Sequence, residues 1–439
     1  MTMSSNPRRF RRDPAAGVDL LIAGASARSA VFSAIRGGFR VAAADLFADA
    51  DLAENADATR IRNWPGGVVE WTRSFPGDVP FLYAGGLENC PEMLEEIARD
   101  RIVAGVMRGG LREIRDPTFL SAWCRRSGFR YPRLLSASTV GSRESLVKPR
   151  RGTAGLGIRC YEGGPLAVDD YLQEFVNGVS GSAAYLVNAS GAEFLGRCRQ
   201  LPREPSDAAR LPPFLYRGSV TQRTSFDDWL AELGEGLNRL GVRGLCGVDF
   251  IDPGEGSPVI LEINPRWTAS MELLELRVGR SFISEHAACF GIFPSQGKPN
   301  DHSSAFSHAV AGSLGKRILF APRAIRWRTP PPEILPPIDV QSLKFDCESL
   351  VPMGARHSAS DRVRTGRASG TRQSSIDAEF VSDGVPVIAD VPQPGRRIDA
   401  GEPLCTIFAA GDNFEACRLE LLARERRLLA FLETAEPSG

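Results

Sequence analysis

The chain has 439 residues, enough for about three domains. Its formal net charge is zero and 43% of its residues are hydrophobic, so composition gives no reason to expect a nucleic-acid or membrane partner. No apolar run approaches the ~18 residues of a membrane span, and the basic N-terminus lacks the apolar stretch of a secretory signal. Nine cysteines without a C-x-x-C pair are typical of reduced thiols, which indicates a cytoplasmic protein.

Residues 1–16 are predicted to be a disordered tail, followed by an α/β domain over residues 17–130. A strand at Val18–Ala23 runs into a turn at Gly24, then a helix around Ala30–Ile35 and a strand at Val41–Ala44. Only one glycine of the dinucleotide fingerprint is present, so a structural turn is favoured over NAD binding. The next elements expected are a strand at Phe81–Ala84 and helices at Pro91–Arg99 and Thr118–Ser127.

A second domain is expected over residues 131–330. It begins with a strand carrying Lys148, one of four lysines in the chain, and a loop that contains Gly152, Thr153, Gly155 and Gly157. Glycines let backbone N–H groups approach a polyphosphate, and lysine supplies a positive charge. The loop does not follow the P-loop pattern, and a flexible hairpin tip is the alternative.

The next segments carry no specific functional motif when each is considered alone. Strands at Tyr171–Val176 and near Ala183–Val187 form either a plain hairpin or an edge for adenine, and Asp227–Leu240 has the spacing of a core helix. Helices are also expected at Met271–Leu276 and Ile283–Phe290, with His286 a packed core residue.

The stretch Gly247–Ser270 predicts a β-hairpin that carries a metal site. Because side chains alternate along a strand, Asp249 on one strand and Glu262 and Asn264 on the other can share a face. Two carboxylates and an amide oxygen are ligands that suit Mg²⁺ (or Mn²⁺). Arg266 follows and can bind a phosphate or carboxylate. A hairpin with a solvated polar face is the alternative.

Residues 331–439 are predicted to be a linker and a small β-barrel-like domain with a terminal helix. The linker is the proline-rich Thr329–Pro337, and the polar stretch Arg356–Ser375 is expected to be a mobile loop. Short strands are expected within Val385–Phe408. The helix at Asn413–Leu432 has an apolar side that packs on the body or forms a homodimer. That side is formed by Leu419, Leu421, Leu422, Leu428, Leu429 and Leu432.

In their order, these motifs resemble an ATP-grasp enzyme over residues 18–330. The resemblance implies an α/β fold with a Rossmann-like first domain, a two-lobed ATP-grasp domain and a small β-rich C-terminal domain. It implies Mg²⁺ ligands at Asp249, Glu262 and Asn264 and an acyl-phosphate contact at Arg266. It also implies a set of ATP-binding residues: Lys148, Gly152, Thr153, Gly155, Gly157, Gln173, Glu174, Phe175, Val176 and Ser180. Glu174 and Val176 would meet adenine through their backbone, and Ser180 stands where a ribose-binding carboxylate is expected.

The implied function is an ATP-dependent carboxylate–amine ligase acting on small molecules. The segment Tyr83–Asn89 and the tail are similar to a bacterial group linked to methanopterin- and methanofuran-dependent one-carbon metabolism, which implies glutamate or another amino acid as substrate. One departure is that residues 1–147 contain no lysine. The usual upstream lysine must therefore be replaced by Arg115 or another arginine, or its contact is missing. The alternatives are a catalytically silent ATP-binding scaffold, a dinucleotide-dependent oxidoreductase, or a carboxylase or phosphotransferase of the same fold.

Overall fold

The computed structural model describes residues 17–136, 145–207, 210–222, 228–295, 312–339, 381–382 and 385–434. The predicted tail at 1–16 and the polar stretch at 356–375 lie outside these residues. None of the helices in the described ranges is both long and apolar enough to cross a membrane. The eight described cysteines are all free thiols.

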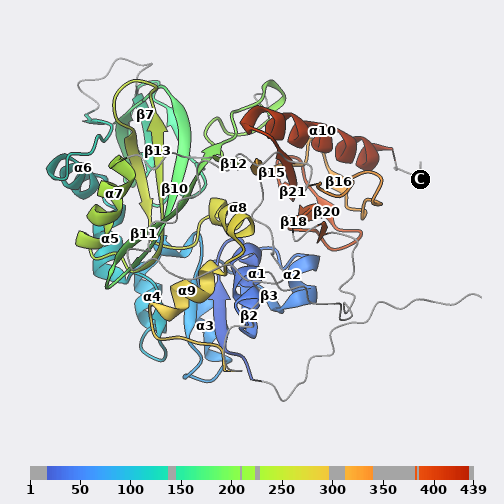
Figure 1. Ribbon diagram of the computed structural model, residues 1–439, viewed down its shortest axis with the longest axis horizontal. Helices are drawn as coiled ribbons and strands as arrows, with labels where there is room; N and C mark the ends of the chain where they lie inside the picture. The colour runs from blue at the N-terminus through green and yellow to red at the C-terminus, as the bar shows by residue number, and fades with distance from the viewer. Residues whose placement is uncertain are drawn as a thin grey trace, which may run out of the picture.

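The N-terminal part is a five-stranded parallel sheet with strand order β3-β2-β1-β4-β5. Figure 1 labels β2 and β3 of this sheet, near α1, α2 and α3. Its strands are β1 (Leu20–Ala23), β2 (Val41–Asp45), β3 (Asp57–Arg60), β4 (Phe81–Tyr83) and β5 (Val103–Ala104). Its helices are α1 (Arg28–Arg36), α2 (Ala50–Asn55), α3 (Gly67–Arg73), the 3₁₀ turn η1 (Leu87–Asn89) and α4 (Pro91–Ile97). The central strands are buried apolar runs, as a covered parallel sheet requires. The predicted β-α-β beginning is confirmed.

Two helices lead from this sheet to a small antiparallel sheet. They are α5 (Arg108–Arg115) and α6 (Pro117–Arg126), and the Asp116 side chain caps α6 by accepting a hydrogen bond from the N–H of Thr118. The small sheet has the order β6-β9-β7-β8. Its strands are β6 (Leu134–Leu135), β7 (Ser145–Pro149), β8 (Arg159–Cys160) and β9 (Asp170–Glu174). Strand β7 therefore carries Lys148 opposite Tyr171 of β9.

The large antiparallel sheet has the order β14-β13-β10-β11-β12-β15-β21-β19. Its strands are β10 (Val179–Asn188), β11 (Gly191–Gln200), β12 (Gly218–Gln222), β13 (Gly244–Asp252), β14 (Val259–Asn264), β15 (Ser313–Phe320), β19 (Ile388–Ala389) and β21 (Pro403–Gly411). The turn η2 (Pro205–Asp207) lies between β11 and β12, and helices α7 (Asp228–Arg239), α8 (Ala269–Val278) and α9 (Phe282–Ala288) complete this part.

Helices α7 and α8 cover opposite faces of the large sheet. Along β10, Ala183 and Tyr185 join the hydrophobic cluster of α7, whereas Ala184 and Leu186 join the cluster that contains α8. This division follows from the alternation of side chains along a strand. The predicted core helices are therefore confirmed, with α8 extending beyond the expected Met271–Leu276 on both sides.

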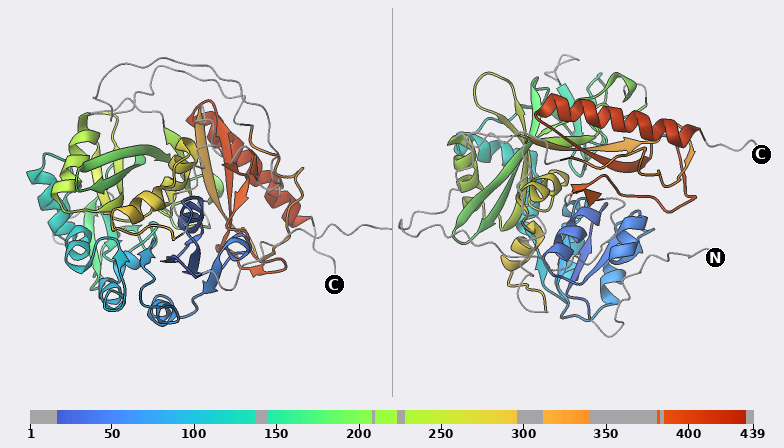
Figure 2. Two further views of the ribbon diagram at one scale, coloured as in Figure 1. Left: turned by 60° about the horizontal axis from the view of Figure 1, so that its bottom comes forward. Right: turned by 45° about the vertical axis from the view of Figure 1, so that its right-hand side comes forward.

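The C-terminal part is β-rich and ends in a helix, as expected. Its short strands are β16 (Ile325–Arg326), β17 (Val381–Ser382), β18 (Val385–Pro386) and β20 (Arg397–Ile398), and its helix is α10 (Phe414–Glu433). Its long strand β21, however, pairs with β15 over the length of both strands and so extends the large sheet (Figure 2). A domain boundary near residue 330 stays a prediction, because the sheet contains strands from both sides of it.

The terminal helix packs against β21 and β15 through a face that differs slightly from the predicted one. Leu421, Leu428 and Leu432 are buried as expected, but Leu419 is 53% exposed. Arg424 lies on the buried face instead and donates a hydrogen bond to the carbonyl oxygen of Pro336. The guanidinium is tolerated there because the stem of arginine packs on apolar surface while its head finds partners.

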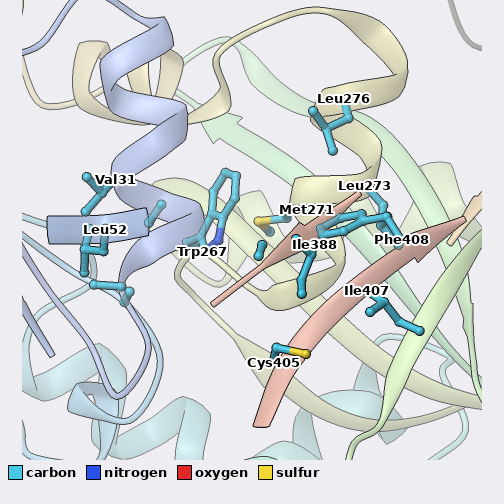
Figure 3. Packing of buried hydrophobic residues seen from close by; sticks show 14 of the residues in the cluster. Val31, Leu52, Trp267, Met271, Leu273, Leu276, Ile388, Cys405, Ile407 and Phe408 are labelled. Carbon is cyan, nitrogen blue, oxygen red and sulfur yellow. The ribbon is translucent and has the colours of Figure 1, made fainter. Parts of the chain in front are cut away.

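One hydrophobic cluster joins the three parts of the chain. Figure 3 shows Trp267 and Met271 lying between Val31 of α1 and Ile388 and Phe408 of the C-terminal strands. Because interiors are close-packed, this shared core fixes the N-terminal sheet against the strands that carry the candidate site.

The prediction that His286 is a packed core residue agrees with its surroundings. The side chain is 2% exposed, its Nδ1 accepts a hydrogen bond from the N–H of Leu245 at 2.8 Å, and its Nε2 lies 3.3 Å from the carbonyl oxygen of Ala104. Burial lowers the pKa of His286 to about 4.

We expect this histidine to make the protein less stable in mild acid. Its pKa is lower in the folded state than the value of about 6.5 in an unfolded chain, so the unfolded state binds more protons as the pH falls below that value. Between pH 7 and pH 5.5 the free energy of unfolding should fall by about 1 kcal/mol more in the wild type than in His286→Gln. Urea unfolding of both proteins measures this, and equal pH dependence would contradict the assignment.

Candidate active site

The three predicted metal ligands come together on the hairpin formed by β13 and β14. Asp249 stands opposite Glu262, and Gly247 stands opposite Asn264, with an irregularity in register just after Asp249. The side-chain amide of Asn264 donates a hydrogen bond to Asp249 Oδ2 at 3.0 Å. Glu262 joins them through Arg115, which forms an ion pair with Glu262 and lies 3.5 Å from Asn264 Oδ1. The predicted convergence is thus present, while the ligand roles stay predictions.

The chemistry of this donor set fits Mg²⁺. It offers two carboxylates and one amide oxygen, and a magnesium ion takes few protein oxygens because it keeps water and phosphate as its other ligands. The described residues contain no group of three or more His, Cys, Asp or Glu side chains arranged to hold a metal.

The same neighbouring positive charges act on the pKa values of both carboxylates. Burial, and then the charge of Glu262, raises the pKa of Asp249 to about 7. Burial alone would raise the pKa of Glu262 too, but Arg115 and Lys148 outweigh it and the net shift is downward. The positive charges therefore outweigh burial at Glu262 and lower its pKa, whereas at Asp249 they do not outweigh it and the pKa stays raised.

An open cleft lies beside this cluster. Its walls combine basic groups, loop backbone and apolar side chains from α5, α6, β7, β9 and β14, among them Arg115, Leu120, Lys148, Gly152, Thr153, Gly155, Tyr171, Leu261 and Glu262. Lys148 Nζ donates a hydrogen bond to Gln173 Oε1 at 3.2 Å, and burial lowers the pKa of this lysine. The cleft thus brings together Lys148, the glycine-rich loop and Glu262, one of the three metal-ligand candidates.

The glycine-rich loop is fixed at several points rather than being a free hairpin tip. Ala154 accepts a hydrogen bond from the N–H of Tyr216 at 2.9 Å. A Cβ atom at Gly155, where φ is +76°, would overlap the carbonyl oxygen of Phe214. Gly152 accepts hydrogen bonds from Arg115 Nη2 at 3.0 Å and from Asn89 Nδ2 at 3.3 Å.

Gly155→Ala is expected to weaken ATP binding by about tenfold or more, because the added methyl must push the loop away from Phe214 and costs positive-φ strain. Gly164→Ala is the matched control: Gly164 also has positive φ, at +92°, but no atom lies within 4 Å of the position that its Cβ would take. Calorimetric titration of ATP into both variants gives the comparison. Equal affinities would show that the contact with Phe214 does not matter for the nucleotide.

Arg115, named from the sequence as one possible replacement for the missing lysine, does lie in this site. Its side chain forms the ion pair with Glu262, and its Nη2 donates a hydrogen bond to Asn89 Oδ1 at 3.1 Å. The guanidinium therefore joins the metal-ligand candidates to the glycine-rich loop. Its use as a phosphate contact stays a prediction.

Arg266 is held on the other side of the cluster. Its Nη2 donates to Glu88 Oε1 at 2.5 Å and to Asn264 Oδ1 at 3.2 Å, and its Nη1 donates to the carbonyl oxygen of Trp267 at 3.0 Å. Arg266 is 9% exposed and the side chain of Glu88 is fully buried. The arginine thus lies next to the predicted metal ligand Asn264, as the motif implied.

The residues predicted to meet adenine and ribose lie apart from the walls of the cleft. Gln173 contacts Lys148, but Glu174 binds the backbone N–H of Arg133 through its carboxylate at 3.1 Å. Phe175 has an edge contact with the ring of Phe214, and Ser180 stands in β10 opposite Ile251. Together with Val176, they stay predictions for the nucleotide base and ribose.

Sequence reasoning missed two residues that the structure places in the site, Glu88 and Asn89. Both belong to the turn η1 that follows β4. Glu88 reaches Arg266, just after β14, and Asn89 reaches Gly152 of the glycine-rich loop. Their position in the sequence could have indicated this role, because polar residues just beyond the carboxyl end of a parallel strand commonly face a binding site.

The structure also bears on dinucleotide binding at the first turn. Asp45, the residue that would bind a ribose, is 2% exposed and accepts hydrogen bonds from the N–H groups of Ala27, Phe47 and Ala48. A Cβ at Gly24 would lie 2.7 Å from Ala84 Cβ, so this glycine is needed for packing. The structural interpretation of the turn accounts for both residues.

The chain combines a parallel first sheet, a small sheet with a basic glycine-rich loop, and a larger sheet with an acidic hairpin. Residues 115–270 match the family model of the ATP-grasp domain. This part of the chain is therefore similar to an ATP-grasp domain. The chain has no significant match among curated protein sequences.

Solved structures of this fold resemble nearly the whole chain. The biotin carboxylase domain of the 2-oxoglutarate carboxylase of Hydrogenobacter thermophilus matches with a TM-score of 0.60 and 12% identity, over 97% of this chain and 91% of that chain. Biotin carboxylase from Campylobacter jejuni gives 0.58 and 11%, over 95% of each chain. N5-carboxyaminoimidazole ribonucleotide synthetase from Thermus thermophilus gives 0.56 and 14%, over 96% of this chain and 100% of that chain. At these identities the likeness concerns the fold.

Proposed function

We propose that this chain is an ATP- and Mg²⁺-dependent ligase that joins a carboxylate to an amine through an acyl phosphate. The observation that carries the proposal is the meeting of Asp249, Glu262 and Asn264 with Lys148 and Arg266 beside one cleft of a matched ATP-grasp domain. Support also comes from the similar domain of Hydrogenobacter thermophilus, which is described in complex with ADP, its magnesium salt and bicarbonate.

In this proposal the two halves of the site hold the two ends of the triphosphate. Lys148 and the backbone N–H groups of Gly152–Gly157 bind the phosphates from one side of the cleft. Asp249, Glu262 and Asn264 would hold Mg²⁺ on the other side, where the ion would supply positive charge against the phosphates. Glu262 is paired with Arg115 in this structure.

The reaction takes place next to Arg266. An oxygen of the substrate carboxylate attacks the γ-phosphorus, the bond to the ADP oxygen breaks, and an acyl phosphate forms. Arg266 donates hydrogen bonds to the acyl phosphate. The amine then attacks the acyl carbon, the C–N bond forms, inorganic phosphate leaves, and the amine loses a proton. The loop over the cleft keeps water from the acyl phosphate.

The finer proposal concerns the substrates. Similarity in the Tyr83–Asn89 segment and the tail favours glutamate or another amino acid as one substrate and an aromatic amine as the other, in synthesis of a methanofuran- or methanopterin-type cofactor.

The test is Mg²⁺-dependent ADP release from the purified full chain. Glutamate paired with tyrosine or tyramine is tried first, then other amino acids and aromatic amines, with bicarbonate as a separate carboxylate. ADP formed only when one acid and one amine are both present supports the ligase and names its substrates. ADP formed with bicarbonate and an amine alone identifies a carboxylase instead.

One observation favours a second candidate function, a catalytically silent ATP-binding scaffold. Arg115 already pairs with the metal-ligand candidate Glu262, and the upstream lysine is absent. Tight ATP binding without ADP release in any mixture supports the scaffold. Binding of NAD(P) in place of ATP would instead support the oxidoreductase.

A further inference from the structure

The turn between β4 and α4 brings the N-terminal sheet into contact with the proposed reaction centre. Gly85 and Gly86 follow β4, and a Cβ at Gly85 would lie 3.6 Å from Cζ of Arg266, so the backbone passes close to the guanidinium. Gly86 has φ of +99°, which turns the chain into η1. The turn therefore delivers Glu88 directly to Arg266.

Glu88 is the acidic partner of Arg266 among the described residues. Its side chain is fully buried, and Oε1 accepts the hydrogen bond from Nη2 at 2.5 Å. The other contacts of Arg266, to the Trp267 carbonyl and to Asn264, come from its own loop and strand. Glu88 is thus the contact that fixes the guanidinium from across the site, because a carboxylate holds arginine by a charged, directional bond.

This ion pair leaves two polar atoms unused. Within the described part of the chain, Glu88 Oε2 and Arg266 Nε are both buried and have no hydrogen-bond partner. A buried polar atom left without a partner costs about 1–3 kcal/mol. Such atoms also occur away from the site, at Arg101 and Arg424 among others, so it is the contact of Glu88 with Arg266 that connects the turn with the site.

We infer that Glu88 is a positioning residue for Arg266, so that the N-terminal sheet orients the arginine for an anionic phosphate or carboxylate group. The inference rests on the role proposed for Arg266. It explains why a turn far from the hairpin in sequence lies within the site, and it gives the sequence Gly85-Gly86-Leu87-Glu88-Asn89 a function.

The test uses inorganic phosphate as the probe, because the phosphate is common to the proposed intermediate and product. Calorimetry measures phosphate binding to the full chain with and without MgADP. Four proteins form a cycle: wild type, Glu88→Gln, Arg266→Ala and the double variant. Glu88→Gln should weaken phosphate binding about tenfold, and the double variant should be no weaker than Arg266→Ala alone.

Glu275→Gln is the matched control for loss of a buried carboxylate. Glu275 is 1% exposed and pairs with Arg36 across a similar junction between α1 and α8. It should leave phosphate affinity unchanged even if it lowers stability as much as Glu88→Gln does. If Glu88→Gln does not fold, Glu88→Asp, which keeps the charge and shortens its reach, takes its place in the cycle with the same expectation.

Three outcomes overturn the inference: unchanged or tighter phosphate binding in the Glu88 variant, losses that add in the double variant, or no phosphate binding by the wild type. Failure of the proposed function is seen separately, as no ADP release by the wild type with any acid and amine. Where ADP release is found, Glu88→Gln should lower kcat about a hundredfold and change KM for ATP little. An equal loss of kcat in Glu275→Gln would indicate that Glu88 has only a structural role.

Discussion

Glu262→Ala is expected to lower the rate of Mg²⁺-dependent ADP release by about a thousandfold or more. Glu262 is the carboxylate of the hairpin that stands opposite Asp249 and lines the cleft beside Lys148. Without it, the proposed magnesium site would keep one carboxylate and one amide, too few oxygen ligands to hold the ion firmly. The acid and amine identified by the substrate screen serve as the assay.

The comparison needs a variant that separates metal binding from folding. Glu262→Ala also leaves Arg115 without its charged partner, so Glu262→Gln, which keeps the shape and one acceptor oxygen, is measured beside it. Both should lose activity, because a neutral amide is a weaker ligand for Mg²⁺ than a carboxylate. Glu255→Ala removes an exposed carboxylate from the turn of the same hairpin and should be fully active. Unchanged turnover in the Glu262→Ala protein would refute the metal assignment.

Local patterns in the sequence were enough to predict the hairpin and the convergence of its polar side chains. Alternation of side chains places Asp249, Glu262 and Asn264 on one face, and it needs only the two strands and the turn between them. Lys148 and the glycine-rich loop were found in the same way, as a strand followed by residues with unusual backbone freedom. Helix α6 followed from Asp116 and Pro117, a cap and a first-turn residue that act within one turn.

The remaining parts of the site depend on contacts between distant segments. Arg115 reaches Glu262 across 147 positions of sequence, and Glu88 reaches Arg266 across 178. Neither pair has a local spacing that reveals it, since each depends on how the parallel sheet docks on the larger one. The pairing of β21 with β15 is of the same kind: alternation identifies a strand but does not name its neighbour.

A buried network of charged side chains connects the N-terminal sheet with the large sheet and the C-terminal part. Arg28 of α1 donates to both oxygens of Glu272 on α8, at 2.6 and 3.1 Å, and Lys316 of β15 donates to Glu272 Oε2 at 2.7 Å. Arg28 also donates to Asp390 of the C-terminal part at 2.8 Å. Arg28, Glu272 and Lys316 are each less than 5% exposed. Glu272 therefore links the N-terminal sheet and the large sheet, and Arg28 extends the link to the C-terminal part.

Glu272→Ala should accordingly destabilise the protein by about 3–5 kcal/mol, because it leaves two buried cations without their shared partner. Burial by itself raises the pKa of Glu272, but Arg28 and Lys316 outweigh it and lower the pKa to about 2. In the unfolded chain the pKa is near 4.5, so the stabilisation is complete above that value and is lost as the pH falls from 4.5 towards 2.

Urea unfolding at pH 7 and at pH 3 checks both parts of this prediction. The difference in stability between the wild type and Glu272→Gln should be large at pH 7 and smaller at pH 3, because at pH 3 the unfolded wild-type chain binds a proton at Glu272 that the folded state does not bind. Glu96→Ala, which breaks an ion pair with Arg73 whose side chains are 40% and 54% exposed, should change stability little. A Glu272 variant as stable as the Glu96 control would mean that the hydrophobic core around Trp267 and Phe408 holds the three parts together without the charges.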